Sequence, residues 1–289
     1  MWVAWVLGGL AVWAGAALLI GVLVGSGIAR ADRPGAVARP VSAARPARVR
    51  RRALPLPPFG VALAAVAVAL EAGGYAVRLA GSSGGMADVF SMEAPLSLPR
   101  MYVAALFGVA ALAALAGAGR MPGRRAWWTA VGVVAGVVAL VKAGGQVHTW
   151  AVGELADVLT GPAAVVLSAV LAVGVLAGLW WLSRTERRDR RRVLGTLGGY
   201  ALAAVGLSAL TAFVEGRYGI GSTWAAAATF GEESAEALAG VSFLVAVLAG
   251  VAPRLVLPRE WATRRAADAH TLEVAERHPA RVAPGDLSH

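Results

Sequence analysis

Long apolar stretches constrain this chain more than any other feature of its sequence. A helix needs about 20 mostly apolar residues to cross the hydrocarbon core of a bilayer. Stretches of about this length occur at residues 2–28, 58–80, 101–119, 126–148, 162–182, 193–214 and 224–252. Charged residues make up 15% of the 289-residue chain, against about 25% in a typical soluble domain. We therefore predict an all-α, multi-pass membrane protein with a bundle of about seven transmembrane helices.

The distribution of Arg predicts how this bundle is oriented. Arg residues crowd the loops after the first, third and fifth predicted helices and the tail after the last one, whereas the alternate loops carry Arg100 and Arg217 among acidic residues. Short loops rich in Arg stay in the cytoplasm. The alternation predicts an N-terminus outside and a C-terminus inside. It also accounts for the formal charge of +10 without nucleic acid as a partner.

Tryptophans mark the ends of the predicted helices. Indole rings favour the two membrane–water interfaces. The predicted outer boundaries carry Trp2, Trp150 and Trp224, and the predicted inner boundaries carry Trp127, Trp128, Trp180 and Trp181. We interpret all of them as interfacial anchors. The lipid bilayer is then the expected partner and the plasma membrane the expected location. The many Arg, Ala, Gly and Val residues favour a bacterial, GC-rich source.

The predicted organisation has four parts. Residues 1–28 form the first transmembrane helix, 29–57 an Arg/Pro/Ala-rich cytoplasmic linker, 58–252 a six-helix membrane core and 253–289 a cytoplasmic tail. The composition of the linker cannot bury a core, so we expect an extended or disordered segment. Its Arg residues either contact anionic lipid headgroups or serve only to fix the topology, and the second interpretation is the simpler one.

Several ionisable residues fall inside the predicted helices, where each costs roughly 2.5–3.5 kcal/mol on insertion scales. They are Glu71, Lys142, Glu232, Glu233 and Glu236. At 1.5 Å per helical residue, all lie roughly 12–18 Å below the outer interface. They therefore share one depth, in the outer half of the bundle. If their helices are neighbours, we expect them to form a single site.

The chemistry of this predicted site follows from its spacing. Glu236 lies four residues after Glu232 and three after Glu233, so it neighbours both on one helix. Lys142 is the one Lys of the chain. Three carboxylates so close together in low dielectric do not all stay ionised without compensation. We predict a Lys–Glu ion pair, with at least one Glu protonated or bound to a cation.

Three stretches of the chain share a pattern with known sequences. The first is Phe90-Ser91-Met92-Glu93 with Pro99 beyond it, and the last is Glu232-Glu233-x-x-Glu236. The middle one is the end of the fourth predicted helix. Together, over about residues 60–252, they resemble a family of uncharacterised bacterial membrane proteins with seven transmembrane helices.

The resemblance implies the seven-helix fold, and one departure from it bears on activity. The family shows Asp-Glu and then His-Glu near the end of the fourth helix. This chain has Lys142-Ala143 and then His148-Thr149. If the family site is catalytic, the departure implies an altered or inactive member.

Three functions remain open. The first, which we favour, is binding or transport of a proton, a cation or a small ligand by Glu71, Lys142, His148, Glu232, Glu233 and Glu236. The second is an intramembrane hydrolase in which His148, Glu232 and Glu236 hold a metal that activates water. Lys142 would oppose that cation, and a catalytic zinc commonly needs three protein ligands. The third is a structural or regulatory subunit with the charges as a packing network. Neither enzymatic activity nor a particular cofactor is predicted.

Overall fold

The computed structural model describes residues 57–144, 161–184 and 187–257. The predicted first helix at 1–28, nearly all of the 29–57 linker, His148 and most of the 253–289 tail therefore lie outside the described residues. The same holds for Trp2 and Trp150.

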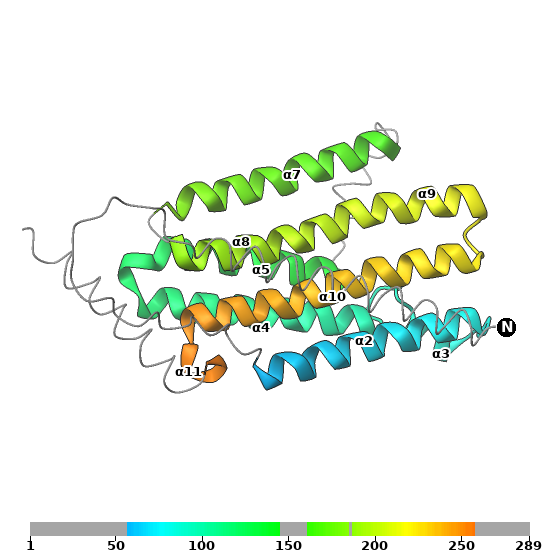
Figure 1. Cartoon of the computed structure of the whole chain (residues 1–289), viewed down its shortest axis with the longest axis horizontal. Helices are drawn as coiled ribbons and strands as arrows, with labels where there is room; N and C mark the ends of the chain where they lie inside the picture. The colour runs from blue at the N-terminus through cyan, green and yellow to red at the C-terminus, as the bar shows by residue number, and fades with distance from the viewer. Residues whose placement is uncertain (1–56, 145–160, 185–186, 258–289) are drawn as a thin grey trace, which may run out of the picture.

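The described chain is built from helices that run side by side along the long axis of the molecule (Figure 1). The long helices are α2 (Pro58–Leu79), α4 (Leu98–Arg120), α5 (Arg125–Lys142), α7 (Gly161–Leu182), α8 (Arg187–Ala201), α9 (Ser208–Tyr218) and α10 (Thr223–Val251). Shorter elements are α3 (Gly85–Phe90), the 3₁₀ turn η1 (Pro122–Arg124), the π-helical segment η2 (Leu202–Leu207) and α11 (Pro253–Val256).

Five helical segments are long and apolar enough to cross a membrane. They are Pro58–Leu79, Leu98–Arg120, Pro122–Lys142, Asp189–Tyr218 and Thr223–Val251, and a shorter apolar stretch, Val166–Leu182, lies in α7. The span Asp189–Tyr218 joins α8, η2 and α9 into one continuous helix. The all-helical, multi-pass architecture is therefore as predicted. The number seven and the orientation stay predictions.

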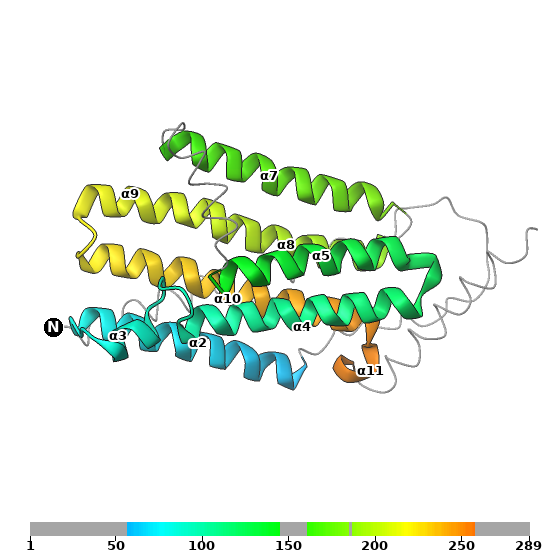
Figure 2. The same ribbon diagram turned by 180° about the vertical axis from the view of Figure 1, so that it is seen from behind.

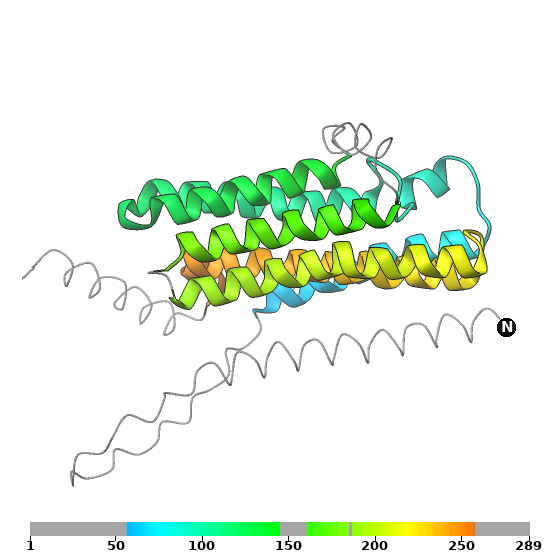
Figure 3. The same ribbon diagram turned by 90° about the horizontal axis from the view of Figure 1, so that it is seen from above.

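The two ends of the bundle are distinct. One end, here called the α3 end, holds the end of α2, helix α3 and the turn between α9 and α10. The opposite end, here called the α11 end, holds the turn between α4 and α5 and helix α11 (Figures 1 and 2). Seen from above, α2, α9 and α10 reach further towards the α3 end than α4 and α5 do (Figure 3).

Helix α10 is the centre of the packing, because it contacts α2, α4, α8 and α9. Glycines let helices approach closely: a Cβ at Gly250 would lie 2.3 Å from the Trp128 ring, and one at Gly132 would lie 2.8 Å from Leu115. Small residues at helix contacts are typical of membrane proteins, where packing rather than water drives association. A hydrogen bond of 2.7 Å from the Tyr102 hydroxyl to the Leu63 carbonyl ties α4 to α2.

Two of the predicted interfacial tryptophans are instead part of the core. Trp127 is 2% exposed and Trp128 is 0% exposed, and both belong to the main apolar cluster. The prediction was wrong because position near a helix end does not say which way a ring points. Trp180, Trp181 and Trp224 are more than half exposed, which suits rings that face lipid or an interface.

The fourth predicted helix is shorter than expected. The prediction placed it at 126–148, but α5 ends at Lys142, with Ala143 as its C-cap. Gly144 then adopts φ +92°, a left-handed conformation that commonly ends helices. The prediction missed the end of this helix because hydropathy carries no information about backbone conformation. Lys142 consequently lies at a helix end rather than within a helix.

Candidate functional site

The predicted charged residues meet between α2, α5 and α10. We call Glu71, Lys142, Glu233 and Glu236 the acid–lysine cluster. All four are buried, with exposed fractions of 1%, 6%, 6% and 3%. Glu71 comes from the middle of α2, Lys142 from the last residue of α5, and the other two carboxylates from the middle of α10. The site therefore draws on three segments far apart in the sequence.

Lys142 bridges two carboxylates of α10. Its Nζ lies 2.9 Å from Glu233 Oε2 and 2.8 Å from Glu236 Oε2. Charge-assisted contacts of this length are strong where the groups are buried and the dielectric constant is low. Because Glu233 and Glu236 lie three residues apart, they share one helix face and can both reach a single ammonium group.

Glu71 completes the cluster, and it has no ion pair with any residue of the described ranges. It is nearly fully buried, and its Oε2 has no hydrogen-bond partner among the described residues. It interacts electrostatically with Glu233, Lys142 and Glu236. A buried carboxylate oxygen without a partner is costly if it carries charge. Glu71 is thus the member of the cluster whose charge is least compensated.

Arg100 is a second cation beside the cluster. Its Nε donates to the Lys142 carbonyl at 3.4 Å and its Nη1 to the Glu93 carbonyl at 3.3 Å. It thereby supplies a donor to the end of α5, where backbone carbonyls lack intrahelical partners. It also interacts electrostatically with Glu71 and with Tyr200. Sequence analysis had assigned it to a loop, yet it lies in the first turn of α4.

The π-helical segment η2 aligns polar side chains with the acidic face of α10. Tyr200, just before η2, lies close enough to Glu236 to interact with it electrostatically. Ser208 and Thr211, just after η2, present their hydroxyl groups on the side of α10 that carries Glu232. A π-bulge inserts extra backbone that reorients the following turn, and such segments are frequent at functional sites. Glu232 therefore lies on the α9 side, apart from the ion pairs of Lys142.

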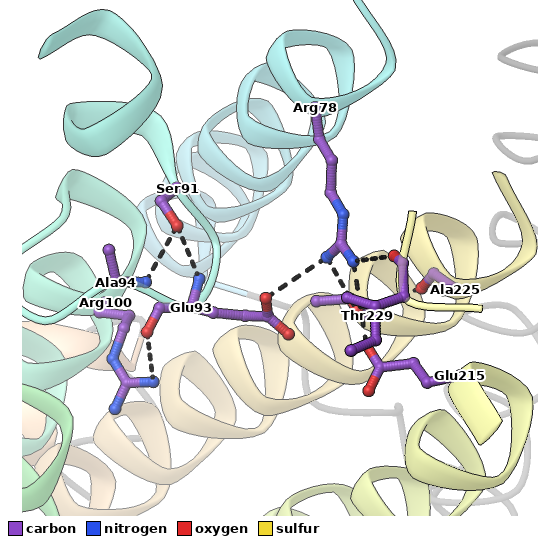
Figure 4. Close-up of polar contacts among 9 residues, drawn as sticks. Arg78, Ser91, Glu93, Ala94, Arg100, Glu215, Ala225 and Thr229 are labelled. Carbon is purple, nitrogen blue, oxygen red and sulfur yellow. Dashed lines mark hydrogen bonds and ion pairs between the residues drawn. The ribbon is translucent and has the colours of Figure 1, made fainter. Parts of the chain in front are cut away.

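A second polar group lies towards the α3 end and was not expected from the sequence. We call Arg78 and its contacts the Arg78 network (Figure 4). Arg78 Nη1 lies 3.4 Å from Glu93 Oε2 and donates to Thr229 Oγ1 at 3.2 Å. Its Nη2 donates to the Ile220 carbonyl at 3.1 Å and lies 3.8 Å from Glu215 Oε1. One guanidinium thus links α2, the loop after α3, α9 and α10.

The residues after α3 fold against the bundle between these two polar groups. Ser91 Oγ accepts hydrogen bonds from the backbone N–H groups of Glu93 and Ala94 at 3.3 and 2.9 Å (Figure 4). Met92 is 3% exposed and joins Tyr75, Ala226 and Phe230 in a small apolar cluster.

Backbone packing fixes this segment closely against its neighbours. A Cβ at Gly74 would lie 2.4 Å from the Phe90 carbonyl oxygen, so the backbone after α3 packs directly on α2. The Phe90-to-Glu93 stretch thus packs against α2 and α10 at the α3 end.

The structure brings together some predicted residues and leaves others apart. Glu71, Lys142, Glu233 and Glu236 meet, Glu232 lies beside them, and His148 is outside the described residues. Within the described ranges, no group of three or more His, Cys, Asp or Glu side chains is arranged to hold a metal ion. Tyr200, Arg100 and the Arg78 network were missed, because their roles depend on how helices pair.

No protein-family model, curated protein or solved structure matches this chain. The resemblance to a bacterial seven-helix family therefore stays a prediction, and the site has to be interpreted from its own geometry.

Proposed function

We propose that this membrane protein binds and transfers a proton, or a small monovalent cation in its place, at the acid–lysine cluster. The observation that carries the proposal is the charge balance of a buried site. Three carboxylates, those of Glu71, Glu233 and Glu236, face one ammonium group. Even with Arg100 counted, carboxylates outnumber cations. In low dielectric the excess negative charge requires a bound proton or cation.

Glu71 is the residue we assign to the exchangeable proton. Glu233 and Glu236 are already paired with Lys142 at 2.9 and 2.8 Å, whereas Glu71 Oε2 has no hydrogen-bond partner in the described part of the chain. Protonation would remove the charge that is least compensated. Intramembrane carboxylates of this kind serve as proton relays in pumps and transporters.

The proposed orientation places the α3 end outside the cell. The α11 end gathers Arg residues around the turn between α4 and α5, at the start of α8 and in α11: Arg120, Arg124, Arg125, Arg190, Arg191, Arg192 and Arg254. The α3 end carries acidic residues such as Asp88, Glu93 and Glu215 beside its few Arg residues. Arg-rich short loops are retained in the cytoplasm, which supports an N-out, C-in topology in the plasma membrane.

A flux measurement tests the proposal. The purified protein is reconstituted into liposomes that contain a pH-sensitive dye, and a potential or a pH gradient is imposed. We expect protein-dependent proton movement that Glu71→Gln reduces to the level of protein-free liposomes, because the amide keeps the size of the side chain but cannot exchange a proton. The same assay with Na⁺ or K⁺ gradients distinguishes a cation from a proton.

The matched control is Asp88→Asn, which neutralises an exposed carboxylate on α3. This variant should retain the flux of the unchanged protein. Equal loss in both variants, or no protein-dependent flux of protons or monovalent cations at all, would contradict the proposal. The cluster would then be interpreted as a packing network.

A further inference from the structure

The acid–lysine cluster lies between the two ends of the bundle, and water lies beyond each end. The structure favours one of these ends as the access to the cluster. We propose that the cluster opens towards the α3 end, and that the Arg78 network together with the Tyr75–Phe230 pair forms the gate that closes this route. This inference rests on the proposed function. It concerns the access route rather than the bound species.

The first argument is the register between α2 and α10. These antiparallel helices place Arg78 opposite Thr229, Tyr75 opposite Phe230, and Glu71 near Glu233 and Glu236. Arg78 lies seven residues from Glu71, and Thr229 lies seven residues from Glu236, so both steps equal two helical turns, about 10 Å. The gate and the cluster therefore lie on the same two helix faces, one above the other.

The second argument is the thickness of the apolar packing on each side. Towards the α11 end the cluster abuts the main core, which includes Phe107, Trp127, Trp128 and Phe243. Towards the α3 end, the apolar cluster in the described part of the chain consists of Tyr75, Met92, Ala226 and Phe230. Tyr75 and Phe230 stack with ring centroids 5.0 Å apart. This small cluster, with one stacked pair of rings, buries far less apolar surface than the main core and is easier to separate.

The third argument is the exposure of the Arg78 network. The side chain of Arg78 is 25% exposed and that of Glu93 is 56% exposed, so no protein layer within the described ranges covers the outer side of this network. The ion pairs and hydrogen bonds of Arg78 have lengths of 3.1–3.8 Å. They are also not fully buried. Breaking them would remove the polar contacts that tie the end of α2 to α9 and α10.

Cysteine labelling tests the gate, because the chain contains no natural cysteine. The reporter is Ser234→Cys, a nearly isosteric change at a 1% exposed position one turn beyond Phe230. The Oγ of Ser234 has no hydrogen-bond partner among the described residues, so the change breaks no contact there. Exposed markers, Ser83→Cys and Gly123→Cys, report the α3 end and the α11 end respectively. The probe is a membrane-impermeant trimethylammonium methanethiosulfonate added to the side where Ser83→Cys reacts.

We expect the Ser234→Cys variant to be labelled slowly. Adding Arg78→Gln should make labelling about tenfold faster, because this is the factor expected for loss of one charge-assisted hydrogen bond. Phe230→Ala should also accelerate labelling while leaving Arg78 in place, so the test does not depend on one variant. The control Arg124→Gln changes the ion pair with Asp189 at the opposite end, and it should leave this rate unchanged.

Two outcomes would overturn the inference. One is an unchanged labelling rate in both Arg78→Gln and Phe230→Ala, with Ser83→Cys reacting normally as proof that the probe reaches the α3 end. The other is faster labelling of Ser234→Cys from the Gly123→Cys side in Arg124→Gln. Neither result depends on flux, so failure of the gate and failure of the proposed function are distinguishable.

Discussion

We expect Lys142→Met to lower the free energy of unfolding by about 3–5 kcal/mol, the cost of leaving a buried ion pair without one partner. Met fills similar space but leaves Glu233 and Glu236 without the ammonium group that lies 2.9 and 2.8 Å from them. Glu71 is a third buried carboxylate beside them, so the loss of Lys142 leaves still more negative charge uncompensated. The measurement is reversible unfolding in mixed micelles or bicelles.

A triple variant shows whether the loss of stability comes from uncompensated charge or from poorer packing. Adding Glu233→Gln and Glu236→Gln to Lys142→Met removes the charges that Lys142 compensated, and stability should recover by most of the difference, since neutral replacement of a buried ion pair is often tolerated. Arg217→Gln is the control for the loss of an exposed cation, which stacks over Tyr218 and is worth about 0.5–1 kcal/mol. No recovery in the triple variant would mean that Lys142 acts through its shape.

Trp128→Ala is expected to be about as destabilising, although the side chain is uncharged. Trp128 is fully buried against Gly250, where the ring occupies the space of a missing Cβ. Replacing a buried Trp by Ala costs about 3–5 kcal/mol in a soluble core. In lipid the packing share of that cost remains, so we expect the lower end, about 3 kcal/mol. The same unfolding assay provides the measurement.

The matched comparison is Trp181→Ala, which removes an indole that is 59% exposed. Its loss should be much smaller than that of Trp128→Ala. Equal effects in the two variants would contradict the placement of Trp128 in the core and restore the view that all these tryptophans are interfacial anchors.

Sequence alone predicted the membrane character and the acidic residues of the site for a simple physical reason. Charges in hydrocarbon are expensive, so Glu71, Lys142 and the Glu residues of α10 stand out against apolar surroundings. Their common depth follows from counting residues along helices. The spacing of Glu233 and Glu236 also predicts that they share one helix face, and Lys142 contacts both of them.

The remaining features depend on information that hydropathy does not contain. The left-handed turn at Gly144 ends α5 inside an apolar run, and the π-helical segment η2 changes which residues face α10. Trp128 and Trp181 both lie near a predicted inner helix boundary, yet Trp128 is buried and Trp181 is exposed. The Arg78 network joins residues up to 151 positions apart, so it arises only once α2 and α10 are paired in register.

Infrared difference spectroscopy of the purified protein in lipid, recorded as the pH is changed, tests the central claim most directly. We predict a carboxylic acid band from a protonated buried Glu that disappears in Glu71→Gln and persists in Asp88→Asn. An identical set of carboxyl bands in the unchanged protein and in Glu71→Gln, with every Glu titrating like an exposed side chain, would contradict the assignment of an exchangeable proton to the acid–lysine cluster.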